Sequence, residues 1–152
     1  MFRRLLIGSV TAAAVIFSAS ALAQKADFGT VAEARAMLDK VVAAMKADKV
    51  TTLAQINKGE GGFKDRDLYA VCSGPDGKIA AHPDQSRVGL QQKDNKDSTG
   101  KPYGLEILAA TEGKVSEVTY MFPRPGADRT PRQKTSLVTK TGDYICLVGY
   151  YK

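Results

Sequence analysis

The sequence predicts an α+β domain in which a long N-terminal helix packs on an antiparallel sheet of about five strands. Three observations support this prediction. Apolar residues recur at helical spacing over residues 31–48, two β-like runs flank a Gly-Pro-Asp-Gly turn at residues 74–77, and three further β-like runs follow residue 115. The hairpin connections between these runs favour antiparallel pairing.

The first 23 residues have the pattern of a secretory signal peptide. Arg3 and Arg4 form a basic start, residues 5–17 are largely apolar, and Ala21-Leu22-Ala23 is a small-x-small cleavage site. An uncleaved anchor is the alternative, but the apolar run is short for a membrane span, which needs about 20 residues. We therefore expect cleavage before Gln24 and export of one domain, residues 24–152, to a bacterial periplasm.

Charge and location together limit the class of partner. Loss of Arg3 and Arg4 with the leader lowers the formal net charge from +6 to +4. The remaining basic residues are scattered rather than clustered, and export removes most nucleic acids, so nucleic-acid binding is not expected. A modest positive field still favours small anionic ligands.

The long helix is expected to begin with a capping box and to end near Asp48. Thr30 and Glu33 have the spacing of this motif. The apolar positions of its buried face are Val31, Ala34, Leu38, Val41, Val42 and Met45. A second short helix over residues 51–57 is expected to continue the first after a bend.

The hairpin that follows is expected to organise the sheet. It pairs residues 68–73 with residues 78–82 around Pro75 and Gly77, whose backbone preferences suit a tight turn. An isolated hairpin is marginal in water and needs further strands. The runs that supply them are residues 115–122, 134–141 and 143–151.

A long loop and a short helix separate the two groups of strands. Residues 83–101 are polar and are interpreted as a surface loop, and loops of this length are commonly functional or mobile. Pro102 suits the first turn of a helix over residues 103–112, which Gly113 closes.

Cys72 and Cys146 are the only cysteines, and both lie in β-like runs. In an oxidising compartment such a pair favours one disulfide, with two buried free thiols as the alternative. The chain contains one histidine and no CxxC or CxxCH motif, so we expect no metal and no cofactor. Asp65 and Asp67 flank Arg66 in a charged turn and are predicted to be solvated. No catalytic arrangement is recognisable, and an enzyme is not expected.

Several short motifs occur in a characteristic order. They are Leu-Tyr-Ala-Val-Cys at 68–72, Ala-His-Pro at 81–83, Gly-Lys-Pro-Tyr-Gly at 100–104, Tyr-Met-Phe-Pro-Arg-Pro at 120–125 and Val-Gly-Tyr-Tyr at 148–151. Together they resemble the single Cache domain family, most closely its second subtype, over residues 31–152. The resemblance implies a long helix on a PAS-like antiparallel sheet and an extracytoplasmic sensor module. Because the sequence ends with the last predicted strand, we expect a standalone exported protein.

The resemblance also implies a ligand pocket between the sheet and the layer of loop and short helix. The positions that fall on the family's motif strands are Tyr69, His82, Tyr103, Tyr120, Phe122, Arg124, Lys134 and Ser136. Aromatic walls exclude water, and Lys134 or Arg124 can neutralise a carboxylate. The alternative is structural: core packing for the aromatic residues and a backbone bond that closes the hairpin for His82.

Two functions stay open on the sequence alone. In the first, a periplasmic module binds a small organic anion or amino acid and passes its ligand state to a membrane receptor or sensor kinase. In the second, a domain with a vestigial pocket acts through its surface or as a homodimer along the long helix. A charged cavity favours the first function, and a collapsed apolar interior favours the second.

Overall fold

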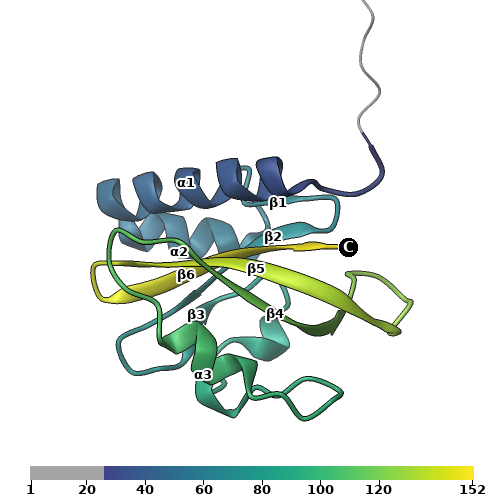
Figure 1. The fold of residues 1–152 in the computed structure, drawn as a ribbon. Helices are drawn as coiled ribbons and strands as arrows, with labels where there is room; N and C mark the ends of the chain where they lie inside the picture. Colours follow the sequence, from purple (N-terminus) through teal and green to yellow (C-terminus); the bar gives the residue numbers. More distant parts are fainter. Residues whose placement is uncertain (1–25) are drawn as a thin grey trace, which may run out of the picture.

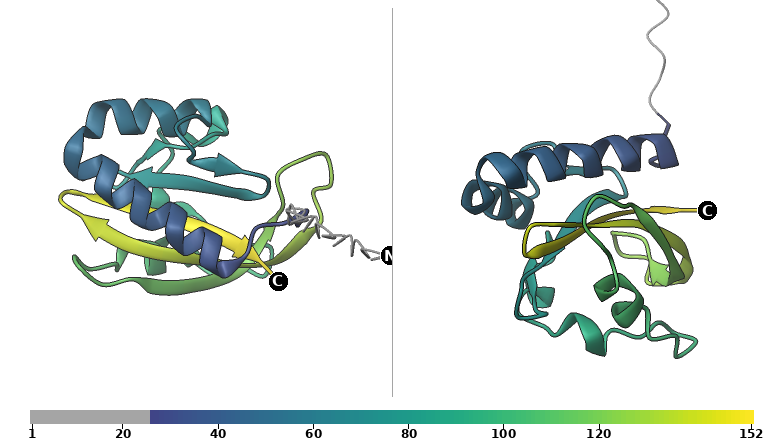
Figure 2. Two further views of the ribbon diagram at one scale, coloured as in Figure 1. Left: turned by 90° about the horizontal axis from the view of Figure 1, so that it is seen from above. Right: turned by 60° about the vertical axis from the view of Figure 1, so that its left-hand side comes forward.

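The computed structural model describes residues 26–152, so the predicted signal peptide lies outside the described residues. Helices α1 (Val31–Ala47) and α2 (Lys49–Lys58) cover one face of a sheet, and α3 (Tyr103–Leu108) lies with loops on the other face (Figures 1 and 2). Among residues 26–152, no helix combines the length and the apolar character needed to cross a membrane.

Local sequence signals set the limits of the two N-terminal helices. The predicted capping box is confirmed, because Glu33 N–H donates to Thr30 Oγ1 over 3.2 Å and Thr30 N–H donates to Glu33 Oε2 over 2.8 Å. Asp48 ends α1 and caps α2, accepting a bond from Thr51 N–H over 3.1 Å. The second helix therefore begins two residues earlier than predicted. Gly59 ends it with a left-handed backbone at φ 68°.

The sheet has six strands in the order β1-β2-β6-β5-β4, and β3 also pairs with β2. The strands are β1 (Lys64–Asp65), β2 (Leu68–Ser73), β3 (Ile79–Ala81), β4 (Ser116–Pro123), β5 (Pro131–Thr141) and β6 (Tyr144–Tyr151). All pairings between these strands are antiparallel. The predicted α+β class is confirmed, and the two-residue strand β1 is the addition to the five expected strands. The pairing of β2 with β6 joins the first hairpin to the last two strands.

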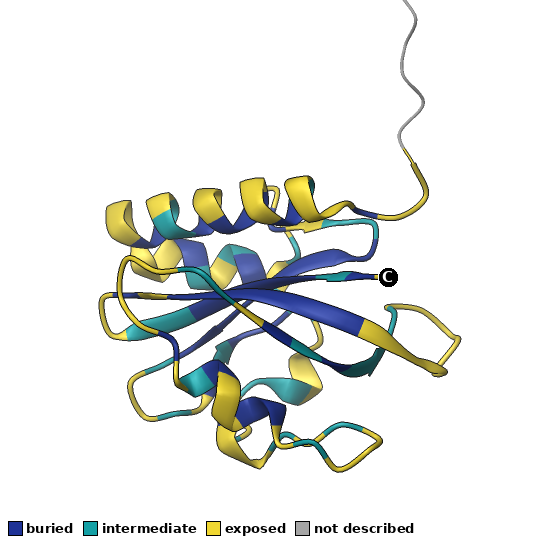
Figure 3. Ribbon diagram, viewed as in Figure 1, coloured by how far each residue is buried: buried dark blue, intermediate teal, exposed yellow. Residues whose placement is uncertain are grey.

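Successive residues of the central strands face two separate cores. On β2, Ala70 and Cys72 pack toward α1 and α2, whereas Tyr69 and Val71 pack toward α3. This is the two-residue alternation of a sheet buried on both faces. Figure 3 shows the resulting buried centre between exposed outer helix surfaces and turns.

A disulfide joins the central strands inside the α1-side core. Cys72 and Cys146 lie directly opposite each other in the β2–β6 pairing, with Cα atoms 4.1 Å apart. Both residues are fully buried. The expected disulfide is confirmed, and the alternative of two free thiols is wrong.

The loop predicted over residues 83–101 forms a structured layer against the second core. It contains two 3-10 helices, η1 (Gln85–Arg87) and η2 (Gln92–Asp94). The Asp97 carboxylate fastens this layer to β4 by accepting the Met121 N–H over 2.9 Å. Gly104 lets α3 approach η2 closely, because a Cβ there would lie 1.8 Å from the Gln92 carbonyl oxygen.

Candidate functional site

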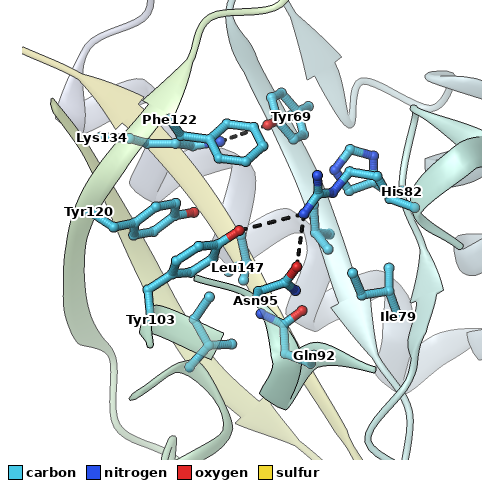
Figure 4. A pocket seen from close by; sticks show the side chains of 13 residues that line it. Tyr69, Ile79, His82, Gln92, Asn95, Tyr103, Tyr120, Phe122, Lys134 and Leu147 are labelled. Carbon is cyan, nitrogen blue, oxygen red and sulfur yellow. Dashed lines mark hydrogen bonds between the residues drawn. The ribbon is translucent and has the colours of Figure 1, made fainter. Parts of the chain in front are cut away.

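A small chamber lies between the sheet and the layer formed by η1, η2 and α3 (Figure 4). Its volume is about 30 Å³, enough for one or two water molecules. The side chains that dominate its walls are Tyr69, His82, Arg87, Tyr103, Tyr120, Phe122 and Lys134. Strands β2, β4 and β5 supply most of them, and η1 and α3 supply Arg87 and Tyr103.

Lys134 is a buried cation in the wall of this chamber. Its exposed fraction is 2%, and its Nζ donates to the Tyr69 hydroxyl over 2.8 Å. Nζ also lies 4.1 Å from the Tyr69 ring centroid and 5.2 Å from that of Phe122. Within residues 26–152, no carboxylate lies within ion-pair distance of it. Burial lowers the pKa of the Lys134 ammonium, so the fold bears an electrostatic cost for keeping this group charged.

The sheet register and one glycine position Lys134. On β5 it lies opposite Tyr120 of β4 and Tyr151 of β6. A Cβ on Gly149 would lie 2.2 Å from Lys134 Cε. The missing side chain at Gly149 therefore provides the space that the lysine stem occupies.

Gly149→Ala is expected to lower the free energy of unfolding by about 1–3 kcal/mol, because the new methyl group displaces the buried lysine stem. In a Lys134→Ala background the stem is absent, so the same substitution should cost much less. Chemical denaturation of the four proteins in this cycle measures the difference. An equal cost in both backgrounds would contradict the proposed steric role of Gly149.

Stacked aromatic rings form the wall beside Lys134. The rings of Tyr103 and Tyr120 have centroids 3.9 Å apart and are nearly parallel, at 2°. Phe122 meets both rings edge-on. The Tyr120 hydroxyl lies 2.9 Å from Ser136 Oγ, which places Ser136 behind the wall. Burial raises the pKa of Tyr69 to about 12, so this hydroxyl stays protonated at neutral pH.

Arg87 is a second cation of the chamber, and sequence reasoning missed it. Its Nη2 donates to Asn95 Oδ1 over 3.0 Å and to the Tyr103 hydroxyl over 3.5 Å, and its guanidinium lies 5.1 Å from the Phe122 ring centroid. It forms no salt bridge within the part of the chain that the structure describes. The length of the loop at residues 83–101 indicated a functional segment. Nothing in the loop sequence, however, showed which of its side chains face the chamber and which face solvent.

His82 closes the first hairpin and also lines the chamber. Its Nδ1 accepts the Asp84 N–H over 2.8 Å, and its own N–H donates to Asn57 Oδ1 over 2.9 Å. Burial, together with the charges of Arg87 and Lys134, lowers the pKa of His82 to about 4. The ring is therefore neutral at physiological pH.

Arg124 lies outside the chamber, in a neighbouring hollow that Tyr69, His82 and Phe122 also line. Its Nε lies 3.2 Å from Asp67 Oδ2, and its guanidinium lies 4.0 Å from the Phe28 ring centroid. Asp67 is 6% exposed, so the prediction that it is solvated is wrong. Its second oxygen accepts the Gly29 N–H over 2.7 Å, and these two bonds account for its burial.

The structure therefore brings six of the eight candidate residues to the chamber walls, with Ser136 behind Tyr120 and Arg124 outside. In Figure 4 the Lys134 side chain extends toward the Tyr69 hydroxyl beside the Phe122 ring. Gln92 and Asn95 also line the chamber and were not predicted. Among residues 26–152, no group of three or more His, Cys, Asp or Glu side chains is placed to hold a metal ion.

Solved sensor structures share this fold. A methyl-accepting chemotaxis protein from Vibrio parahaemolyticus is 18% identical, with a TM-score of 0.64 over 79% of this chain and 86% of that one. The periplasmic sensor domain of a chemotaxis protein is 19% identical, with a TM-score of 0.58 over 80% and 89%. A structure described as the basis for carboxylic acid recognition by a Cache chemosensory domain is 21% identical, with a TM-score of 0.56 over 80% and 87%.

A search of curated protein sequences found no match. The family model described as Single Cache domain 2 matches residues 12–150, which is nearly the whole sequence. This match confirms the resemblance that the short motifs indicated. The chain belongs to the single Cache domain 2 family.

Proposed function

We propose that this protein is a periplasmic sensor-type domain that binds a small carboxylate in the chamber. The observation that carries the proposal is the Lys134 ammonium, which is fully buried with no carboxylate at ion-pair distance among residues 26–152. A buried charge is costly unless it is paired. A bound carboxylate would supply the missing partner and accept bonds from Lys134 and from the nearby Tyr69 hydroxyl.

The walls favour a carboxylate over an amino acid. The chamber contains two cations, Lys134 and Arg87, and no Asp or Glu among the residues that line it. A carboxylate suits this charge. The ammonium group of an amino acid would be repelled by both cations and would find no carboxylate to bind. The aromatic rings beside Lys134 suit a short apolar chain.

The present volume limits the ligand and its route of entry. A chamber of about 30 Å³ is too small for most organic ligands. Binding of a carboxylate therefore requires a shift of the η1, η2 and α3 layer, which covers the chamber opposite the sheet. This layer carries Arg87, and a bound carboxylate would attract its guanidinium. The position of the layer would therefore depend on whether the ligand is bound.

We also propose that the mature chain, residues 24–152, passes its ligand state to a membrane receptor or sensor kinase. The family match and the chemotaxis proteins of similar fold support this role. A collapsed apolar interior would favour the alternative, an assembly module with a vestigial pocket. Lys134 and Arg87 make the interior charged, so the observations favour ligand binding. A homodimer along α1 stays a prediction.

A thermal-shift comparison of propionate with alanine tests the proposal, because the two differ only by the amino group. Propionate should raise the unfolding midpoint in a concentration-dependent manner, since a ligand at 100 times its Kd stabilises the folded state by about 2.7 kcal/mol. Alanine should have little effect. Sodium chloride at equal ionic strength is the control. No shift with acetate, propionate or butyrate, or a larger shift with alanine, would overturn the proposal.

A further inference from the structure

A second and larger hollow adjoins the chamber. Its volume is about 210 Å³. Four side chains, those of Tyr69, His82, Arg87 and Phe122, line both spaces, so the chamber and this outer hollow are separated only by shared side chains. The rest of the outer hollow is formed by β1, the segment after His82 and the turn between β4 and β5.

The outer hollow is strongly cationic. Its basic side chains are Lys64, Arg87, Arg124 and Arg129, and Asp84 is its one acidic side chain. Asp67 pairs with Arg124. Lys64, Arg87 and Arg129 have no salt-bridge partner within residues 26–152. The Asp84 carboxylate is already bonded to the N–H and hydroxyl of Ser86. Within the described part of the chain, three cations of the hollow therefore have no salt-bridge partner.

We propose that the natural ligand is a dicarboxylate, with one carboxylate at Lys134 in the chamber and the second in the outer hollow between Lys64 and Arg129. This inference rests on the function proposed above and extends it. Arg87 lines both spaces and lies between the two anionic groups. The site then has an inner part that recognises any small carboxylate and an outer part that selects a second negative charge.

Shared walls between the two spaces support one extended ligand over two separate anions. Tyr69, whose hydroxyl accepts a hydrogen bond from Lys134 Nζ, also lines the outer hollow. A ligand that crosses the Arg87 and Phe122 boundary would bind both sets of cations without the entropy cost of holding a second molecule.

Isothermal titration calorimetry with matched acids tests this inference. Succinate is compared with butyrate, and glutarate with pentanoate, because each pair has the same number of carbon atoms. At least one dicarboxylate should bind about fivefold or more tightly than its partner. Arg129→Gln should lower the affinity for the dicarboxylate more than the affinity for the monocarboxylate, and so reduce this preference. Higher salt should weaken the dicarboxylate more than the monocarboxylate.

Arg132→Gln is the matched control, because Arg132 is exposed, lies close in sequence and pairs with Asp128 outside the hollow. It should leave both affinities unchanged. Equal affinities within both acid pairs, or a dicarboxylate preference that is unchanged in Arg129→Gln, would overturn the dicarboxylate inference and leave the proposed function intact. Absence of binding by all four acids, and by acetate and propionate as well, would overturn both.

Discussion

Lys134→Met is expected to weaken carboxylate binding about a hundredfold, or about 2.7 kcal/mol, and at the same time to stabilise the free protein. Methionine has a similar length but no charge, so a bound carboxylate loses its main partner. The free protein loses a buried ammonium that has no ion pair among residues 26–152, which should raise its free energy of unfolding by about 1–3 kcal/mol. Calorimetry and chemical denaturation measure the two effects on one preparation.

The opposite signs separate loss of binding from loss of folding. A variant that merely unfolds would lose stability together with affinity, whereas Lys134→Met should gain stability. Lys140→Met on the same strand is the matched control, because Lys140 is exposed and lies away from the chamber. It should leave affinity unchanged. A Lys134→Met protein that binds propionate like the parent would refute the assigned role of this ammonium.

Replacement of both cysteines, Cys72→Ala with Cys146→Ala, should lower the free energy of unfolding by about 4 kcal/mol. The bridge joins positions 74 residues apart, so its removal greatly increases the conformational freedom of the unfolded chain. A loss of this size is a large fraction of the 5–15 kcal/mol that stabilises a typical domain. Urea denaturation of the double variant against the oxidised parent measures it.

The parent protein refolded under strong reductant is the internal control and should match the double variant within about 1 kcal/mol. Carboxylate affinity should persist wherever the double variant is folded, because the disulfide and the chamber lie on opposite faces of the sheet. A double variant as stable as the oxidised parent would contradict the expected contribution of the bridge.

Local patterns predicted most of the fold. Thr30 and Glu33 marked the start of α1 because a capping box depends only on residues three apart. The alternating and β-branched runs located the longer strands for a similar reason. The two-residue strand β1 was missed because Lys64 and Asp65 have no strand-like pattern, and their pairing depends on β2 alone.

The sequence predicted mainly those site residues that lie on strands, and it missed those that lie on the loop. The predicted strands contain Tyr120 and Lys134, and the register of β4 with β5 in the structure places these two residues opposite each other. Arg87 comes from a loop whose path depends on tertiary bonds, such as the one between Asp97 and Met121. The partner of Arg124 could not be predicted either, because Asp67, which pairs with it, lies far away in sequence. Such long-range pairings leave no local signal.

The alternation of β2 between two cores has an evolutionary consequence. Cys72 and its neighbours toward α1 maintain the folded state, whereas Tyr69 and its neighbours toward α3 form the chamber. Mutations in the second set can change what is recognised while the disulfide-linked packing toward α1 stays intact. A sheet with two separate cores can thus acquire new chemical preferences in one layer without rebuilding the other.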